Sequence, residues 1–253
     1  MLNTLPLHEE QLLSVKLRLC ALNYDVGPSQ ELDSTTDWAL RWFIARNGLT
    51  EPTPHQLMEA LNHPDAVRGT NDTPVQFYSM KDPVWADYPY KATYTTVIER
   101  MGNSSCGPTS MAMAVSTLLG RAVLPPVLAD WANANGYRDP YGIDGTHENF
   151  FVACAARYGL SGEILYVGED IAQALPVYNR LASALKEGQI VIANVVGGSP
   201  FTQSGHYLLL TSMENNQMSI CDPNPNNADL PVFTREQWLR NRWSKLFVII
   251  RKA

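Results

Sequence analysis

Apolar residues recur at helical spacing through the first 65 positions, and this pattern predicts three short helices. The run Asp33-Ser34-Thr35-Thr36 offers N-caps to the second helix, and Asn47-Gly48 is typical of its C-terminal end. A third helix is expected over residues 54–61, because a proline directly after Thr53 suits the first helical turn. The apolar positions of the first two helices are Leu12, Leu13, Val15, Leu17, Leu19 and Leu22, then Trp38, Ala39, Leu40, Trp42, Phe43 and Ile44.

The rest of the chain passes from helical to strand-like periodicity. Helices are expected over residues 109–119, 127–135, 148–158 and 171–187, the last interrupted at Pro176. Strands are expected over residues 75–79, 190–196, 206–212, 217–221 and 245–251. Helices followed by an antiparallel sheet make the α+β arrangement, which is the fold class we expect.

A polar stretch that includes Gly69 and Pro74 separates the two patterns and predicts a linker over residues 66–74. The linker divides the chain into a small N-terminal unit, residues 1–65, and a larger C-terminal unit, residues 75–253. At 253 residues, of which 45% are hydrophobic and 17% charged, the chain is long enough for one sizeable core and a small satellite domain.

Charge and composition exclude several classes of partner. The formal net charge of −6, from 19 Lys and Arg against 25 Asp and Glu, comes without a basic stripe, so we expect no nucleic acid partner. No run approaches the roughly 18 apolar residues of a membrane span and no signal peptide is visible, so we expect synthesis in the cytoplasm and no membrane partner. The four cysteines form no Cys-x-x-Cys pair, so we expect no metal and no other cofactor, with Cys20, Cys154 and Cys221 in the core.

Cys106 is the strongest candidate for chemistry, because it directly precedes a predicted helix. Unpaired backbone N–H groups and the positive end of the helix dipole favour its thiolate and lower its pKa. His206 opens a predicted strand about a hundred residues later, and Asp222 follows further on. The set suggests acyl transfer, with Cys106 as nucleophile, His206 as general base and acid, and Asp222 orienting the imidazole. The alternatives are a structural cysteine, a core histidine and an aspartate that only begins a turn.

Four segments in fixed order resemble the papain-like cysteine peptidases that process bacteriocin leaders, the double-glycine peptidases. The resemblance runs from about residue 75 to the C-terminus. It implies a papain-like fold, with the nucleophile in a helical half and the histidine and aspartate on an antiparallel sheet. The matching segments are Tyr78-Ser79-Met80-Lys81-Asp82-Pro83-Val84-Trp85, Ser105-Cys106-Gly107-Pro108-Thr109-Ser110-Met111-Ala112-Met113, Ser204-Gly205-His206-Tyr207 and Cys221-Asp222-Pro223-Asn224.

One departure from this family concerns the oxyanion hole. The position of Met80 commonly holds a glutamine whose amide helps to stabilise the oxyanion, and a thioether has no such donor. We expect the backbone N–H of Cys106 to act instead, together with the side chain of Asn103 or Gln76, which are polar and close in sequence. Gly205, directly before the candidate base, completes the candidate substrate-binding residues.

The N-terminal pattern resembles the peptidoglycan-binding domain that is appended to bacterial and phage wall hydrolases, over about residues 9–63. The matching segments are Leu22-Asn23-Tyr24-Asp25-Val26-Gly27 and Trp42-Phe43-Ile44-Ala45-Arg46-Asn47-Gly48-Leu49. Between the helices, the family's Asp-Gly-x-Phe-Gly is replaced by Ser29-Gln30-Glu31-Leu32-Asp33, so the binding groove differs. Trp38, Trp42 and Phe43 are either core residues of the helical unit or rings that contact carbohydrate.

Together the two resemblances imply a peptidoglycan hydrolase, a cysteine endopeptidase or amidase that cuts an amide bond in cell-wall peptides. The N-terminal unit would supply affinity for bacterial peptidoglycan. Without a signal peptide, the protein would reach the wall, in the periplasm or outside the cell, as a phage endolysin released at lysis or as an injected antibacterial effector. An injected effector would have an immunity protein as a candidate partner. The alternatives are a protease that processes proteins or leader peptides, a catalytically decayed wall-binding protein, and a transfer or deamidation enzyme.

Overall fold

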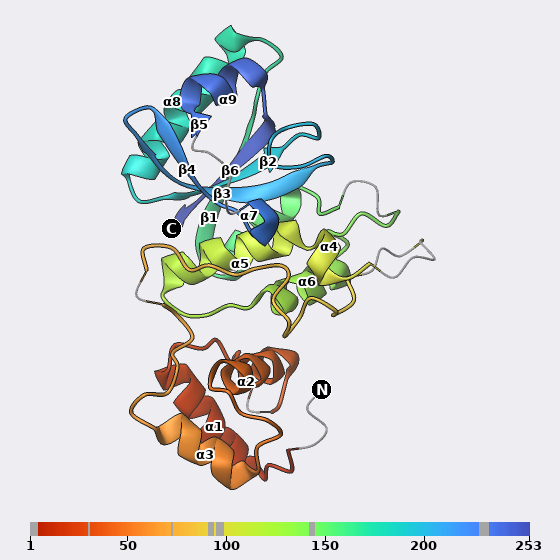
Figure 1. Cartoon of the computed structure of the whole chain (residues 1–253), viewed down its shortest axis with the longest axis vertical. Helices are drawn as coiled ribbons and strands as arrows, with labels where there is room; N and C mark the ends of the chain where they lie inside the picture. Colours follow the sequence, from red (N-terminus) through yellow and green to blue (C-terminus); the bar gives the residue numbers. More distant parts are fainter. Residues whose placement is uncertain are drawn as a thin grey trace.

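The computed structural model describes residues 5–29, 31–71, 73–90, 94, 99–141, 145–227 and 233–253. Residues 1–4, at the start of the segment searched for a signal peptide, lie outside the described residues, as do Gln30 and residue 72 of the expected linker. The described elements form an α+β fold, which confirms the expected class (Figure 1). Among the described helices, none combines the length and apolar character needed to cross a bilayer.

Three helices form the N-terminal unit, as expected. They are α1 (Glu9–Ala21), α2 (Ser34–Arg46) and α3 (Pro54–Asn62). Polar side chains fix where α2 and α3 begin: the Thr36 N–H donates to Asp33 Oδ1 at 2.8 Å, and Thr53 forms a reciprocal capping pair with Gln56. Cys20, which we expected in the core, is exposed, because it lies on the outward side of α1.

The N-terminal helices pack onto the rest of the chain through aromatic side chains of α2. The centroid of the Trp42 ring lies 5.4 Å from that of Tyr78 and 6.0 Å from that of Trp85. Trp42 is 5% exposed, Trp38 is 6% exposed and Phe43 is fully buried. These three rings are therefore core residues and do not offer a surface to carbohydrate, and one hydrophobic core joins the N-terminal helices to the C-terminal unit.

The segment that we expected to link the two units lies against the N-terminal helices. The Val67 N–H donates to Asn47 Oδ1 at 3.0 Å, and the Gly69 N–H donates to the Leu22 carbonyl at 2.7 Å. A Cβ at position 69 would lie 2.5 Å from the Asn23 carbonyl oxygen, so the close approach requires glycine. The boundaries of the linker and of the two units stay a prediction.

Helices make up most of the first half of the C-terminal unit. They are α4 (Met101–Ser104), α5 (Cys106–Leu119), α6 (Pro125–Ala134) and α7 (Asn149–Arg157), followed later by α8 (Ile171–Lys186), a 3-10 turn (Pro225–Asn227) and α9 (Arg235–Asn241). The helix expected from residue 109 starts at Cys106, so the thiol lies in its first turn. Helix α8 continues through Pro176. The missing N–H of the proline removes one helical hydrogen bond, but Tyr178 and Leu181 keep the inner face of the helix buried.

Residues 75–79, expected as a strand, form none. The Gln76 N–H donates to Thr117 Oγ1 at 2.9 Å, on the last turn of α5, and Gln76 Oε1 accepts from the Asn71 N–H at 2.9 Å. The alternating pattern misled the prediction. The polar groups of Gln76 form their hydrogen bonds with the end of α5 and with a neighbouring turn, and no described strand pairs with the segment.

Among the described residues, six antiparallel strands form one sheet in the order β1-β6-β2-β3-β4-β5. They are β1 (Leu160–Tyr166), β2 (Ile190–Val195), β3 (His206–Glu214), β4 (Gln217–Cys221), β5 (Phe233–Thr234) and β6 (Ser244–Lys252). The strands expected near residues 190, 206, 217 and 245 are confirmed. The two edge strands were not predicted, because β5 has only two residues and most of β1 is partly buried without alternation.

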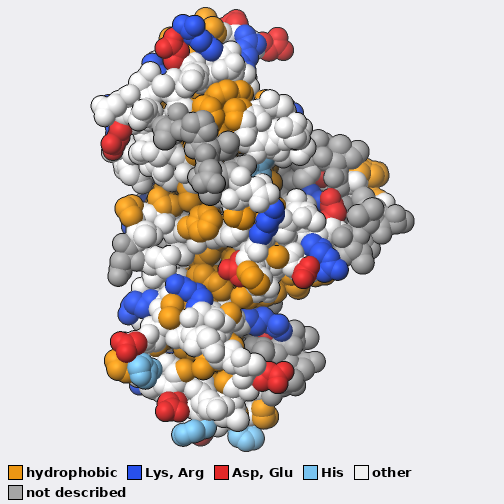
Figure 2. Space-filling view, in the orientation of Figure 1, with side chains coloured by type: hydrophobic (Ala, Val, Ile, Leu, Met, Phe, Trp, Pro, Cys, Tyr) orange, Lys and Arg blue, Asp and Glu red, His pale blue; other side chains and the backbone are white. Residues whose placement is uncertain are grey.

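The side chains of the sheet alternate between two cores. Val191, Ala193 and Val195 pack with α8 and α9, whereas Ile190 and Ile192 pack with α5 and α7. Helix α5 lies between the sheet and the N-terminal helices, with α8 and α9 on the other side of the sheet (Figure 1). On the face drawn in Figure 2, positive and negative side chains are interspersed, and hydrophobic side chains gather where the two units meet. Helix α5 is thus held from both sides.

Candidate active site

Helix α5 presents Cys106 at its first position, and the neighbouring residues hold that end of the helix in place. The Ser105 hydroxyl donates to the Met101 carbonyl at 2.7 Å, which secures the bend between α4 and α5. A Cβ on Gly107 would lie 2.8 Å from the Thr146 side chain. Glycine after the cysteine therefore allows the segment around Thr146 to pack directly on the start of α5.

Strands β3 and β4 bring His206 and Asp222 together. They form a hairpin whose turn residues Asn215 and Asn216 have φ values of 48° and 63°. His206 is the first residue of β3, and Asp222 directly follows β4. Imidazole Nε2 lies 2.7 Å from Asp222 Oδ1, and the two side chains are only 8% and 7% exposed.

The Cys106 thiol and the His206 side chain lie close enough that each shifts the pKa of the other, so the three candidate catalytic residues form one connected set. Because Asp222 occupies Nε2, Nδ1 is the ring nitrogen that remains for the sulfur. Burial raises the pKa of the Cys106 thiol, but the hydrogen bond and charge of His206, with backbone N–H groups of Tyr207 and Gly107, bring that pKa below its ordinary value.

The pKa of His206 changes in the opposite direction. Burial lowers this pKa, but hydrogen bonds to Asp222 and Cys106 and the charges of both groups raise it to about 10. A lowered thiol pKa and a raised imidazole pKa favour a thiolate next to an imidazolium at neutral pH. The arrangement can therefore supply a nucleophile and a proton donor at the same time.

We expect alkylation of Cys106 to stay fast at pH values where an ordinary thiol is protonated. The thiolate is the reacting form, and its lowered pKa keeps it populated below the ordinary thiol pKa of about 8.5. The measurement is the rate of iodoacetamide labelling at Cys106 as a function of pH, read by peptide mass mapping. The same cysteine in the urea-unfolded chain is the control. Equal pH midpoints in the folded and unfolded chains would contradict the pairing with His206.

The other predicted site residues are only partly brought together. Asn103 is exposed on α4, three residues before Cys106, and Gly205 is exposed directly before β3. Gln76 instead binds Thr117, which lies eleven residues beyond Cys106 on α5, or about 16 Å away at the rise of an α-helix. The expectation for Gln76 is therefore corrected. Its nearness to Cys106 in sequence misled the prediction, because the folded chain places Gln76 near the end of α5 that lies opposite Cys106.

Met80 lies beside the site, although its side chain offers no donor. Its backbone N–H donates to the Pro223 carbonyl at 2.9 Å, one residue beyond Asp222, and its side chain is buried. The residue in place of the family's glutamine therefore does neighbour the candidate triad. In the described part of the chain, no group of three or more His, Cys, Asp and Glu side chains is arranged to hold a metal ion.

Four buried residues meet beside the first turn of α5, and of these only Tyr207 belongs to a segment that resembles the family in sequence. The Tyr90 hydroxyl lies 2.8 Å from Thr146 Oγ1, and the Tyr207 hydroxyl donates to the Thr146 carbonyl at 3.1 Å. The Arg138 guanidinium lies over the Tyr90 ring, 4.8 Å from its centroid. Apart from Tyr207, no local motif marks these residues, because they come from segments far apart in the chain and meet only in the folded protein.

Comparisons with known proteins agree with this geometry. The model of the Peptidase_C39 like family matches residues 85–246, which contain the candidate triad but leave out the N-terminal helices. No curated protein matches the chain.

Three solved structures are similar to the C-terminal unit at low identity. The peptidase domain of Streptococcus ComA, a bi-functional ABC transporter involved in a quorum sensing pathway, is 20% identical over 59% of this chain and 93% of that chain, with a TM-score of 0.42. A C39-like peptidase from Bacillus anthracis is 17% identical over 59% of this chain and 90% of its own, with a TM-score of 0.41. A double glycine motif protease of an AMS/PCAT transporter, in complex with the leader peptide, is 17% identical over 64% and 94% of the two chains, with a TM-score of 0.39.

Proposed function

Because the chain belongs to the C39-like peptidase family, and is therefore a cysteine peptidase, we propose that it cleaves an amide bond in the peptide part of bacterial peptidoglycan. The observation that carries the chemistry is the connected set of thiol, imidazole and carboxylate, with 2.7 Å between His206 Nε2 and Asp222 Oδ1. The substrate class follows from the resemblance of the N-terminal helices to wall-binding modules.

The proposed reaction has two steps, and each member of the set acts in both. The Cys106 thiolate attacks the carbonyl carbon of the scissile amide, and the imidazolium of His206 donates its proton to the leaving amine. The acyl group remains on sulfur as a thioester. Water then attacks the thioester while His206 accepts a proton, and the carboxylic acid product leaves as the thiolate forms again. Asp222 keeps the imidazole in the orientation and tautomer that both steps need.

The oxyanion needs donors that Met80 cannot supply. We propose the backbone N–H of Cys106, in the first turn of α5 where helix N–H groups have no helical acceptor, together with the side-chain amide of Asn103. Gly205, with nothing within 4 Å of the place where a Cβ would stand, leaves room for the substrate beside His206. Loss of one oxyanion donor costs ~10²–10³ in rate, so an altered hole weakens an enzyme of this type without abolishing it.

The proposed site of action is the wall, reached by release at phage lysis or by injection from another cell. An immunity protein is a proposed partner only for an injected effector. The N-terminal unit would hold the peptidase near its substrate, which raises the local substrate concentration. Since Trp38, Trp42 and Phe43 are buried, wall contact would have to use other surfaces of this unit.

We expect purified sacculi to release peptides with new termini after incubation with the wild-type protein, and not after incubation with Cys106→Ala. The measurement is mass analysis of the soluble fragments, in which addition of one water per cut distinguishes hydrolysis from acyl transfer. Cys20→Ala, which changes an exposed cysteine on α1, is the matched control and should behave as wild type. Identical fragment profiles from wild type and Cys106→Ala would reject a wall hydrolase.

A second candidate is a protease that processes proteins or leader peptides. The observation that favours it is the burial of the α2 aromatic rings against Tyr78 and Trp85, because this makes the N-terminal helices a packed part of the peptidase. Cleavage of a soluble peptide library by a protein that leaves sacculi intact would support this candidate. Failure of the protein to pellet with sacculi would point the same way.

A further inference from the structure

A buried hydrogen bond joins the helix that carries Cys106 to the strand that carries His206. The Ser110 hydroxyl donates to the Tyr207 carbonyl at 3.1 Å, and both residues are buried. Ser110 lies four residues after Cys106 and therefore on the same face of α5. Tyr207 directly follows His206 at the start of β3. The bond thus connects α5 and β3 one helical turn from the candidate nucleophile.

The hydroxyl of Ser110 does not form the bond that hydroxyl side chains often form within a helix. A helical serine or threonine can donate to the carbonyl four residues earlier. Thr117, also on α5, does this and donates to the Met113 carbonyl at 2.7 Å. Ser110 donates instead to an acceptor that lies 97 residues away in the sequence. Its bond therefore stabilises the placement of β3 on α5 and not the helix itself.

The backbone of Tyr207 faces α5 with both its polar groups. In an antiparallel ladder, the N–H and the carbonyl of one residue point to the same side of the strand. The pairing of β3 with β4 begins at Leu209, so this side of Tyr207 can meet the helix instead. Its carbonyl accepts from Ser110, and its N–H is one of the groups that lower the pKa of the Cys106 thiol. Tyr207 therefore contacts α5 at two points, one turn apart.

The side chain of Tyr207 is held in place as well. Its hydroxyl donates to the Thr146 carbonyl at 3.1 Å, and the centroid of its ring lies 4.7 Å from that of Phe151. Thr146 in turn lies where a Cβ on Gly107 would stand, at 2.8 Å. Tyr207 is thus surrounded by fixed partners, and Ser110 is the one that links its backbone to the thiol-bearing face of α5.

We propose that Ser110 is a positioning residue, whose hydroxyl holds the start of β3 against α5 and so sets the separation of the thiol and the imidazole. Proton transfer requires the sulfur and the ring nitrogen to lie within hydrogen-bond reach. Without the hydroxyl, the Tyr207 carbonyl is left buried and without its donor, which favours a shift of the start of β3 that carries His206 with it. The inference rests on the proposed function, because it takes Cys106 and His206 as the reacting pair.

The test is the Ser110→Ala protein, in which the helix should persist because alanine is the best helix former. The first reading is the rate of iodoacetamide labelling at Cys106 as a function of pH. His206 and the Tyr207 N–H both lower the pKa of the thiol, so their displacement should move the labelling midpoint to higher pH. The second reading is peptide release from sacculi, which should fall about 10²-fold, as expected for a misplacement of about 1 Å. Ser110→Thr, which keeps the hydroxyl, should restore both readings.

Ser116→Ala is the matched control, because it removes another buried hydroxyl from the same helix. Ser116 Oγ donates to the Val123 carbonyl at 3.2 Å and accepts from the Tyr78 hydroxyl at 3.1 Å. Its loss should lower the thermal midpoint at least as much as Ser110→Ala does. It should leave the labelling profile of Cys106 unchanged, because these partners do not contact β3.

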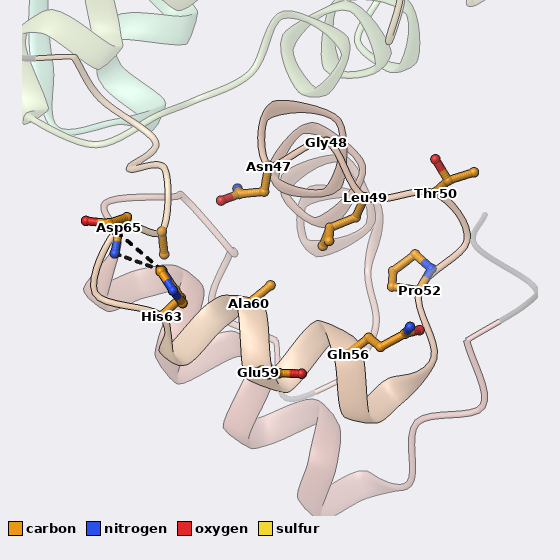
Figure 3. Close-up of a pocket in the computed structure, with 11 residues that line it drawn as sticks. Asn47, Gly48, Leu49, Thr50, Pro52, Gln56, Glu59, Ala60, His63 and Asp65 are labelled. Carbon is orange, nitrogen blue, oxygen red and sulfur yellow. Dashed lines mark hydrogen bonds and ion pairs between the residues drawn. The ribbon is translucent and has the colours of Figure 1, made fainter.

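A distant control lies in the open groove between the end of α2 and helix α3 (Figure 3). The groove contains none of the residues that join α5 to β3. His63 Nδ1 accepts from the Asp65 N–H there at 3.2 Å. His63→Ala removes both an imidazole and a hydrogen bond, and it should leave both readings as in the wild type.

A Ser110→Ala midpoint equal to that of the wild type would overturn the proposal. An equal shift in Ser116→Ala would also overturn it, because general loosening of α5 would then explain the change. A shift in Ser110→Thr as large as in Ser110→Ala would exclude the hydroxyl as the cause. If the wild type itself labels like the urea-unfolded chain, the pairing of Cys106 with His206 fails, and the positioning role fails with it. If wild type and Ser110→Ala label alike at the lowered midpoint and both cut sacculi, only the positioning role is rejected.

Discussion

Replacement of His206 by alanine is expected to reduce peptide cleavage about 10⁴-fold and to leave the fold intact. The imidazole holds the proton that the leaving amine needs, and its hydrogen bond and charge are the main causes that lower the pKa of the Cys106 thiol. Without it, thiolate formation at neutral pH and proton donation are lost together. The measurements are the turnover of a cleaved peptide and the pH profile of Cys106 alkylation, whose midpoint should move to higher pH.

The fold should survive this substitution because the partner of the imidazole keeps another bond. Asp222 Oδ1 also accepts the Asn224 N–H at 2.7 Å, so the carboxylate is not left without a donor. His55→Ala, at an exposed position on α3, is the matched control and should retain full activity and the wild-type labelling profile. If His206→Ala kept more than a tenth of the activity, the proton transfers would have to be assigned to another group.

The candidate triad could be predicted from the sequence because each member lies at the end of an element with strong local signals. Cys106 precedes an apolar run that can only be a buried helix in this setting, and the helix starts at the cysteine itself. The apolar run after His206 is a central strand, and Asn215-Asn216 supplies the positive φ values that a tight hairpin needs. The hairpin, whose register shifts between Leu210 and Ser212, pairs Cys221 at the end of β4 with Leu209, near the start of β3.

The surroundings of the triad could not be predicted in this way, because they depend on contacts between distant segments. Thr146 meets Gly107 at the start of α5 only in the folded protein, and its partners Tyr90 and Tyr207 come from two other segments. Gln76 is the opposite case. It is close to Cys106 in sequence, yet it lies at the far end of α5 in the folded protein. Placing these residues requires the tertiary fold.

For the N-terminal helices, the sequence pattern identified the helix but did not determine whether its apolar face is buried or exposed. The helical spacing of Trp38, Trp42 and Phe43 correctly indicated α2, and it favoured a buried face while leaving a sugar-binding face open. The choice depends on whether another part of the chain covers that face. Tyr78 and Trp85 cover it, which couples the N-terminal unit to the peptidase.

Replacement of Trp42 by alanine is therefore expected to lower the free energy of unfolding by about 3–5 kcal/mol. The indole is 5% exposed and contacts the rings of Tyr24, Tyr78 and Trp85. Its removal leaves a cavity at the junction and removes the ring contacts with Tyr78 and Trp85, while the contact of Trp38 with Tyr88 remains. The measurement is urea unfolding followed by circular dichroism, in which the midpoint should fall.

The shape of the unfolding curve shows whether the two units unfold together, in addition to the stability that its midpoint reports. In the wild type, one continuous core predicts a single transition, whereas loss of the junction should split it into two or lower its slope. Leu17→Ala is the matched control, because Leu17 is 64% exposed on α1 and its truncation should change stability by less than about 0.5 kcal/mol. A Trp42→Ala protein that unfolds in one transition at the wild-type midpoint would mean that the two units hold together without this ring.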